Sequence, residues 1–145
     1  MSGPPGLQER AGVLDLLAAV KYAKDDHDET RFKLCWANDA RLDITSGDKA
    51  IPPVEGREAI MAFYRSVWEA GGHGKGAMRE THIAEYPDIQ MQHHGRLRAR
   101  HAVSFFFADH GEPRLRGFGT FDDVIVFEDG KWCIAHRRAT LVRRL

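Results

Sequence analysis

The spacing of apolar residues changes near residue 70, and this change separates two kinds of predicted structure. Before it, apolar residues recur every three or four positions, as in helices, and after it they alternate with polar residues, as in strands. The first helical stripe consists of Val13, Leu16, Leu17 and Val20. It predicts a helix over about 10–24, which a polar run interrupts.

The following segments predict a second helix and a first strand. Asp28 is suited to cap a helix that carries Phe32, Cys35 and Trp36 inward. Residues 40–44 then alternate like a strand, and we expect a loop over 45–53.

Residues 55–70 carry the clearest helical pattern of the chain. Five apolar residues repeat the helical spacing on one face: Ile60, Phe63, Tyr64, Val67 and Trp68. The glycine-rich segment 71–76 ends this helix. It follows a helix and precedes a strand, whereas a phosphate-binding loop runs from strand to helix, so we expect a connector or a flexible flap over a pocket.

The second half of the chain predicts a meander of four long strands. They cover residues 79–92, 96–108, 114–127 and 131–144, and short polar segments with glycine or proline join them. Helices segregated from an antiparallel sheet make an α+β domain. We therefore expect three N-terminal helices packed against a cone-shaped, curved antiparallel sheet over 10–145, behind a flexible N-terminus over 1–9.

Composition narrows the possible partners of this single domain. The chain has 145 residues, and its 21 basic and 21 acidic residues balance, so no net field attracts nucleic acid or a membrane surface. We see neither a signal-peptide core nor the roughly 20 apolar residues of a membrane span, and we expect a cytoplasmic protein. Cys35 and Cys133 are expected to be buried free thiols. The eight histidines show no ligand spacing, so we expect no metal and no cofactor.

Several short motifs, taken in order, resemble those of a known family. They are Val13-x-x-Leu16-Leu17, Asp25-x-x-Asp28, Trp36-Ala-Asn-Asp39-Ala40, Val54-Glu-Gly56-Arg-Glu-Ala-Ile60, Thr81-His82, Gly119-x-Phe121-x-Asp123 and Asp129-Gly130-x-Trp132-x-Ile134-x-x-Arg137. Over about residues 10–140 the chain resembles the SnoaL-like branch of the nuclear-transport-factor-two-like superfamily. That branch includes scytalone dehydratase, bile-acid 7α-dehydratase and hexachlorocyclohexane dehydrochlorinase.

The resemblance implies a catalytic trio of Asp25, His82 and Arg137. In such a trio the carboxylate orients the imidazole, the imidazole takes a proton, and the guanidinium stabilises the developing anion. Five aromatic residues are expected to contact the substrate: Tyr22, Trp36, Phe63, Phe105 and Phe121.

Strand alternation supports an inward Arg137. Small residues at 133, 135 and 139 share its face, which leaves room for a ligand, and Trp132 and Ile134 are expected on the opposite face. Plain structural roles remain open for all three members of the trio. Asp25 could be a helix cap or a solvated charge, His82 a structural histidine, and Arg138 the inward arginine instead.

The resemblance, with the trio that it implies, predicts a cofactor-independent lyase, above all a dehydratase, or an isomerase. It would act on a small hydrophobic molecule, cyclic or polyketide- or steroid-like. One difference from the resembled enzymes favours other functions. Val20 stands at the position where the bile-acid dehydratase carries a Tyr and the dehydrochlorinase carries a Lys. The alternatives are a non-catalytic binding protein of the same fold and a structural small subunit of the ring-hydroxylating dioxygenase type. In each case we expect a homodimer or homotrimer, which would cover apolar side chains on the open face of the sheet.

Overall fold

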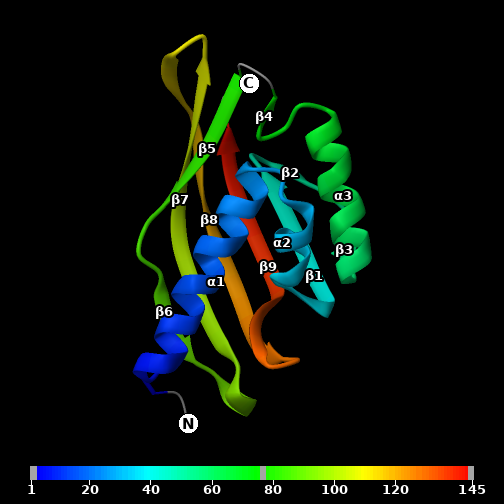
Figure 1. The fold of residues 1–145 in the computed structure, drawn as a ribbon. Helices are drawn as coiled ribbons and strands as arrows, with labels where there is room; N and C mark the ends of the chain where they lie inside the picture. Colours follow the sequence, from blue (N-terminus) through cyan, green and yellow to red (C-terminus); the bar gives the residue numbers. More distant parts are fainter. Residues whose placement is uncertain (1–2, 76–77, 144–145) are drawn as a thin grey trace.

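The computed structural model describes residues 3–75 and 78–143, and its helices pack against one side of a curved sheet (Figure 1). Residues 1 and 2 of the expected flexible N-terminus, Gly76 of the glycine-rich segment and Arg144 of the last predicted strand lie outside this description. The elements are, in chain order, α1 Leu7–Asp25, α2 Glu29–Leu34, β1 Trp36–Ser46, β2 Lys49–Ala50, β3 Val54–Glu55, α3 Arg57–Glu69, β4 Gly74–Lys75, β5 Met78–Ala84, β6 Asp88–Met91, the 3-10 turn η1 His93–Gly95, β7 Leu97–Asp109, β8 Glu112–Glu128 and β9 Lys131–Arg143.

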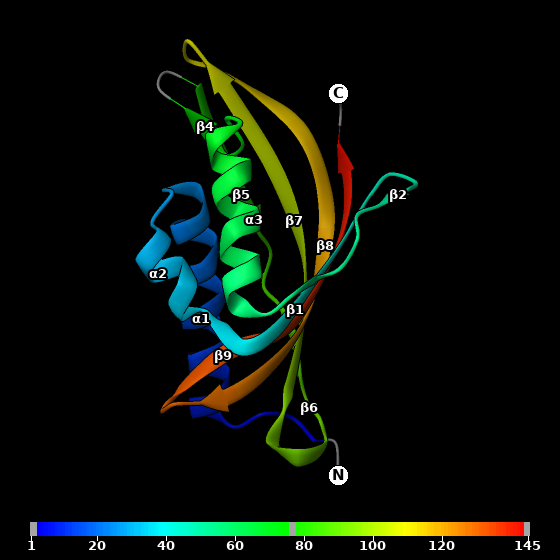
Figure 2. The same cartoon turned by 90° about the vertical axis from the view of Figure 1, so that its right-hand side faces the viewer.

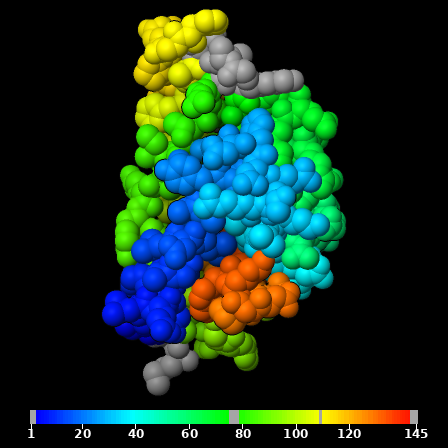
Figure 3. Space-filling view, in the orientation of Figure 1, coloured from blue at the N-terminus to red at the C-terminus, as the bar shows by residue number. Residues whose placement is uncertain are grey.

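Helix α1 buries the stripe that the sequence predicted. Val13 and Val20 are completely or almost completely buried in the core. Gly12 lets this helix approach the β8–β9 hairpin, because a Cβ atom at this position would lie 2.4 Å from the Trp132 ring. The space-filling view shows α1 in blue across this face, with the orange hairpin beside it (Figure 3). None of the helices in the described residues is both long and apolar enough to cross a membrane.

The chain forms regular structure earlier than expected at its N-terminal end. Helix α1 begins at Leu7, inside the stretch 1–9 for which we predicted flexibility. The carbonyl oxygen of Gly3 also accepts a hydrogen bond of 3.3 Å from the amide of Met91 on β6. This end of the chain therefore lies against the end of the sheet that carries β6.

The second helix is shorter than predicted, and the first strand is longer. Helix α2 ends at Leu34, and Trp36 opens β1, which continues to Ser46. Trp36 pairs with Ile134 of β9, and the Ile134 amide donates to the Cys35 carbonyl at 2.8 Å. Pairing with β9 therefore overrides the helical spacing of residues 32–36.

The α+β class is confirmed, and the sheet is mixed rather than purely antiparallel. Among the described residues its strands follow the order β2-β1-β9-β8-β7-β5-β4, with β3 on β1 and β6 on β7. Strands β1 and β9 run parallel, and the other pairs run antiparallel.

The single strand predicted over 79–92 is two strands, because β5 ends at Ala84 and β6 begins at Asp88. Pro87 lies directly before β6, and its ring removes a backbone donor from the ladder. Figure 2 shows all helices on the concave side.

The expected alternation along β9 fails at Ala135. Val124 pairs with His136 and Ile125 pairs with Ile134, so Ala135 has no partner on β8. Such a bulge inserts one residue and resets which side chains face inward. Ile134 and Arg137 consequently share the concave face, and the prediction that they lie on opposite faces was wrong.

Candidate functional site

Asp25 and His82 meet on the concave side, at the junction of α1 and β5. Asp25 Oδ1 lies 2.5 Å from His82 Nδ1, and Asp25 Oδ2 accepts a hydrogen bond of 3.0 Å from the His82 backbone amide. His82 is almost completely buried, and its ring contacts the Phe105 ring edge-on with centroids 4.6 Å apart. A two-point contact of this kind fixes the orientation of the imidazole.

The position of Asp25 is unfavourable for the helix itself. It is the last residue of α1, where the helix dipole presents its negative end, and a carboxylate is destabilising there. The contacts to His82 offset this cost. A residue that opposes the local rule and is compensated by one specific partner is typical of a functional position.

Asp25 is held in its ionised form. Burial alone would raise the pKa of this carboxyl, but the hydrogen bonds and charge of His82, with the charge of Lys24, outweigh burial and hold the pKa below its ordinary value. Lys21, one turn earlier on α1, has its Nζ atom 3.7 Å from Asp25 Oδ2. An ionised carboxylate only accepts hydrogen bonds, so Nδ1 of His82 carries the hydrogen and the Nε2 lone pair is the basic site of the ring.

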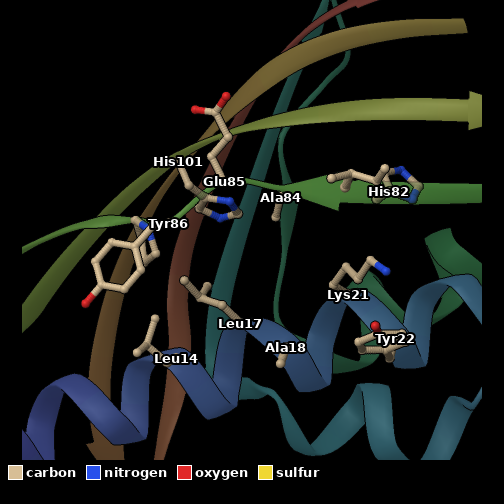
Figure 4. A pocket seen from close by; sticks show the side chains of 12 residues that line it. Leu14, Leu17, Ala18, Lys21, Tyr22, His82, Ala84, Glu85, Tyr86 and His101 are labelled. Atoms are coloured by element: carbon tan, nitrogen blue, oxygen red, sulfur yellow. The ribbon is translucent and has the colours of Figure 1, made fainter. Parts of the chain in front are cut away.

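His82 lines two cavities, which we name the outer and the inner cavity. The outer cavity, about 470 Å³, lies between α1 and the β5–β6 segment (Figure 4). Its other lining residues include Leu14, Leu17, Lys21, Tyr22, Tyr86 and His101. The inner cavity, about 210 Å³, lies between the sheet and α3, and its lining includes Lys24, Phe63, Tyr64, His73, Phe105 and Phe121. Both linings are largely apolar.

The structure distributes the five predicted substrate-contacting aromatics over three places. Tyr22 lines the outer cavity and is about half exposed. Phe63, Phe105 and Phe121 line the inner cavity. Trp36 lines neither cavity, because it is fully buried with its ring against Phe32, at a centroid distance of 5.7 Å.

Arg137 points inward, as predicted, but it is not part of the Asp25–His82 contact. Its guanidinium forms a bidentate pair with Asp123, with donor to acceptor distances of 2.7 and 2.8 Å. Both side chains are almost fully buried, and neither lines a cavity described above. The guanidinium lies 4.3 Å from the centroid of the Phe121 ring, which lines the inner cavity. Arg138, the alternative candidate, is exposed.

The sequence did not predict three features of the site. Asp123 pairs with Arg137, Lys24 is buried, and His101 lines the outer cavity. Asp123 belongs to an inward-facing series with Phe121 and Ile125, and a carboxylate at an inward strand position requires a buried partner. That signal was available in the sequence. Lys24, which is 3% exposed, could not be told from a solvated helix-end lysine, because its burial depends on the sheet beneath it.

The described residues contain no cluster of metal ligands, and the thiol of Cys35 is not ionised near neutral pH. No group of three or more His, Cys, Asp or Glu side chains in 3–75 and 78–143 is arranged to hold a metal ion. Cys35 and Cys133 are buried free thiols, as predicted. Burial raises the pKa of Cys35 to about 11, so this thiol is not ionised near neutral pH.

Comparisons with known proteins agree with this fold. Residues 5–138 match the SnoaL-like domain. Among curated proteins, none matches the chain. Similar solved structures include the β subunit of a putative aromatic-ring-hydroxylating dioxygenase from Novosphingobium aromaticivorans, with 13% identity, a TM-score of 0.78, and coverage of 94% of this chain and 91% of that one.

Two further solved structures share the fold. One is an NTF2-like protein with a cystatin-like fold from N. aromaticivorans, with 18% identity, a TM-score of 0.73, and coverage of 93% of this chain and 82% of that one. The other is a Catenulispora acidiphila protein in complex with S-DNPA, with 17% identity, a TM-score of 0.76, and coverage of 94% and 95%. At these identities the likeness establishes a shared fold and not a shared reaction. The family match covers most of the chain, which therefore belongs to the SnoaL-like domain family.

Proposed function

We propose that this protein is a cofactor-independent enzyme that abstracts a proton from a small hydrophobic substrate, as a dehydratase or isomerase does. The observation that carries the proposal is the 2.5 Å contact between Asp25 and Nδ1 of a His82 ring that lines two apolar cavities. His82 is the base, and Asp25 fixes its tautomer and stabilises the imidazolium that forms.

The cavities support a compact, mostly apolar substrate. The outer cavity has Leu14, Leu17 and Tyr86 on its walls, with Lys21 and Glu85 as charged groups, and its volume suits a molecule of one or two rings. Proton abstraction next to a carbonyl builds negative charge on the carbonyl oxygen, and a nearby cation stabilises that charge. Lysines supply this cation here, Lys21 in the outer cavity and Lys24 in the inner one. Arg137 is assigned instead to holding Asp123.

Exchange of hydrogen for deuterium at carbon tests the base directly and needs no knowledge of the natural substrate. Cyclic ketones of one and two rings are incubated with the protein in D₂O, and loss of the α-proton signal is followed by NMR. We expect exchange with the wild-type protein and a reduction of about 10²- to 10⁴-fold in His82→Gln. His136→Gln is the matched control, because His136 also contacts a carboxylate, that of Asp43, but lines neither cavity. Absence of exchange with every ketone would count against the proposal.

A non-catalytic binding protein is the second candidate, and two observations favour it. Val20, where the resembled enzymes carry Tyr or Lys, is fully packed in the core, and Arg137 is engaged by Asp123. In that case the ketones would bind without exchange. Ligand-induced shifts of the His82 imidazole resonances, with no loss of the α-proton signal, would establish binding without turnover.

Self-association is proposed on the outer face of the sheet. Phe118 and Val142 are opposite one another on β8 and β9, and they are 56% and 49% exposed. Adjacent exposed apolar side chains of this kind are often covered by a partner. Light scattering coupled to size-exclusion chromatography should give a mass two or three times that of the chain, and Phe118→Asp should lower it to one. A monomeric wild-type protein would leave the structural-subunit alternative, in which a different chain covers this face.

A further inference from the structure

We infer that Lys24 binds a carbonyl substrate covalently in the inner cavity, as an iminium ion at its Nζ atom, and so activates the C–H bond from which His82 removes the proton. The inference rests on the proposed function and deepens it. It selects aldehydes and ketones of about one ring as substrates, and it gives Lys24 a covalent role in addition to that of a positive charge.

Lys24 carries a primary amine into the interior of the protein. The residue is 3% exposed, whereas the side chain of Lys21, one turn earlier on α1, is 20% exposed. Lysines are almost never buried to this degree, because their ammonium groups are strongly hydrated. The Nζ atom of Lys24 lies 4.9 Å from the centroid of the Phe121 ring, and both residues line the inner cavity. The amine is therefore placed against the cavity and not in bulk solvent.

The lining of the inner cavity suits condensation of an amine with a carbonyl group. Its walls are mostly apolar and include Phe63, Val67, Phe105 and Leu141. An apolar environment makes a lysine amine a better nucleophile, which is how lysines that form Schiff bases are activated. Condensation also releases water, and a cavity with little water slows the reverse hydrolysis. A lysine in this position is therefore better suited to imine formation than the exposed lysines of the surface.

The charges next to Lys24 are compatible with an iminium ion. Burial raises the pKa of the neighbouring Asp25, and the contacts to His82, together with the charge of Lys24, outweigh burial and lower it. An iminium ion carries the same positive charge as the ammonium group that it replaces. Asp25 therefore stays ionised and continues to orient His82 when Lys24 is bound to a substrate.

The base shares this cavity with the amine. Lys24 and Asp25 are consecutive residues at the end of α1, and Asp25 contacts the His82 ring, which also lines the inner cavity. The cavity has a volume of about 210 Å³, so a one-ring ketone joined to Lys24 fills much of it. The carbons next to the iminium are thus confined together with His82, and tethering raises the effective concentration of a reacting group.

The reaction balances with these two groups and water. The neutral amine adds to the carbonyl carbon, a proton passes from nitrogen to the oxygen, and the resulting hydroxyl group takes a proton from solvent and leaves as water with the C–O electron pair. The iminium ion that remains withdraws electrons from the neighbouring carbon. His82 Nε2 takes a proton from that carbon, the C–H electron pair forms a carbon–carbon double bond, and the C=N pair moves to nitrogen. In D₂O a deuteron returns to the carbon, and water adds to the iminium to release the ketone, the amine and one proton.

Reductive trapping detects the covalent bond, and deuterium exchange detects the proton transfer. Cyclohexanone is incubated with the protein in D₂O, and loss of its α-proton signal is followed by NMR. A parallel sample receives sodium cyanoborohydride, which adds hydride to an iminium carbon and leaves a stable secondary amine. The modified lysine gains the mass of the ketone less one oxygen atom, and mass spectrometry of peptides locates it.

We expect the adduct at Lys24 in the wild-type protein. Lys24→Arg keeps a positive charge but cannot form an imine, so it should lose the adduct and lower exchange by about 10²- to 10⁴-fold, because the base then meets an unactivated C–H bond. Lys33→Arg is the matched control, because Lys33 is paired with Glu58, has a side chain 41% exposed and lines neither cavity. It should leave both measurements unchanged. Lys24→Met is the second variant should Lys24→Arg fail to fold, as judged by circular dichroism.

The two measurements separate this inference from the proposed function. Wild-type exchange without an adduct at Lys24, an adduct spread evenly over the lysines, or exchange at the wild-type rate in a folded Lys24→Arg would overturn the covalent role and leave His82 as a base beside a fixed charge. An adduct at Lys24 without exchange would support the covalent site and contradict the proposed function. If the wild-type protein shows neither adduct nor exchange, both proposals fail.

Discussion

The two faces of the sheet carry the same kinds of ion pair in different surroundings. On the concave face His82 contacts Asp25 at 2.5 Å, and on the convex face His136 contacts Asp43 at the same distance. The first pair has side chains exposed by 2% and 7%, and the second by 28% each.

Two arginine–aspartate pairs show the same contrast between a buried and an exposed ion pair. Arg137 and Asp123 form a bidentate pair inside, and Arg98 and Asp122 form one outside. Asp122 and Asp123 are neighbours in sequence, so alternation alone sends them to opposite faces. Contact distance therefore does not identify a site in this protein. The Asp25–His82 pair differs from the His136–Asp43 pair in its burial and in the two cavities that adjoin it.

The largest difference between the faces should be catalytic. Asp25→Asn leaves His82 without the group that orients it, and we expect proton exchange into cyclic ketones to fall by about 10²- to 10⁴-fold. Asp43→Asn removes the equivalent carboxylate outside and should leave the rate within about two-fold, since a surface pair contributes little. Equal rates for the two variants would show that burial of the Asp25–His82 pair has no catalytic meaning. NMR-detected exchange measures both.

The buried arginine pair should give the largest difference in stability. Arg137→Met leaves the Asp123 charge buried without its partner, and we expect a loss of about 3–5 kcal/mol in the free energy of unfolding. Arg98→Met should cost no more than about 1 kcal/mol. The double variant Arg137→Met/Asp123→Leu removes both charges, so it should be more stable than Arg137→Met alone. Urea unfolding gives all three values.

The pH dependence of stability should also separate the faces. The folded-state pKa of Asp25 lies below its ordinary value of 3.8, so its ionised form stabilises the fold above about pH 4 and that stability is lost as pH falls through the folded pKa. Asp25→Asn should therefore be less stable than wild type by about 1.5–3 kcal/mol at pH 7, with a gap that closes below about pH 4. The pKa of Asp43 is also lowered, first by its hydrogen bond to Arg41, but that group faces solvent. Asp43→Asn should show a gap within about 1 kcal/mol.

Salt should have the smallest effect and should act on one face. The contribution of the Arg98–Asp122 pair is within about 1 kcal/mol and should vanish near 1 M NaCl, where the screening length is about 3 Å. The loss in Arg137→Met should persist at that salt concentration, because water and ions do not reach a buried pair. A loss that shrinks equally in both variants would mean that the concave face is hydrated.

The sequence predicted the parts of the fold and site that depend on local pattern. Helix α1, with Asp25 at its end, followed from the spacing of apolar residues, and the family motif paired Asp25 with His82. What it did not predict depends on pairing between distant segments. Because β1 pairs in parallel with β9, Trp36 lies in a strand and not in the expected helix. The ion pair of Arg137 with Asp123 follows from the register of β8 and β9, which alternation within one strand does not contain.

Ala135 illustrates how much a single residue decides. Ile134 faces the core, and strict alternation beyond it would turn His136 inward and Arg137 outward. The extra residue reverses that outcome, so the side chain that reaches the buried carboxylate of Asp123 is a permanent cation and not a group whose charge depends on pH. The bulge thus gives the interior a positive charge that stays constant with pH, where strict alternation would have placed a histidine whose charge changes with pH.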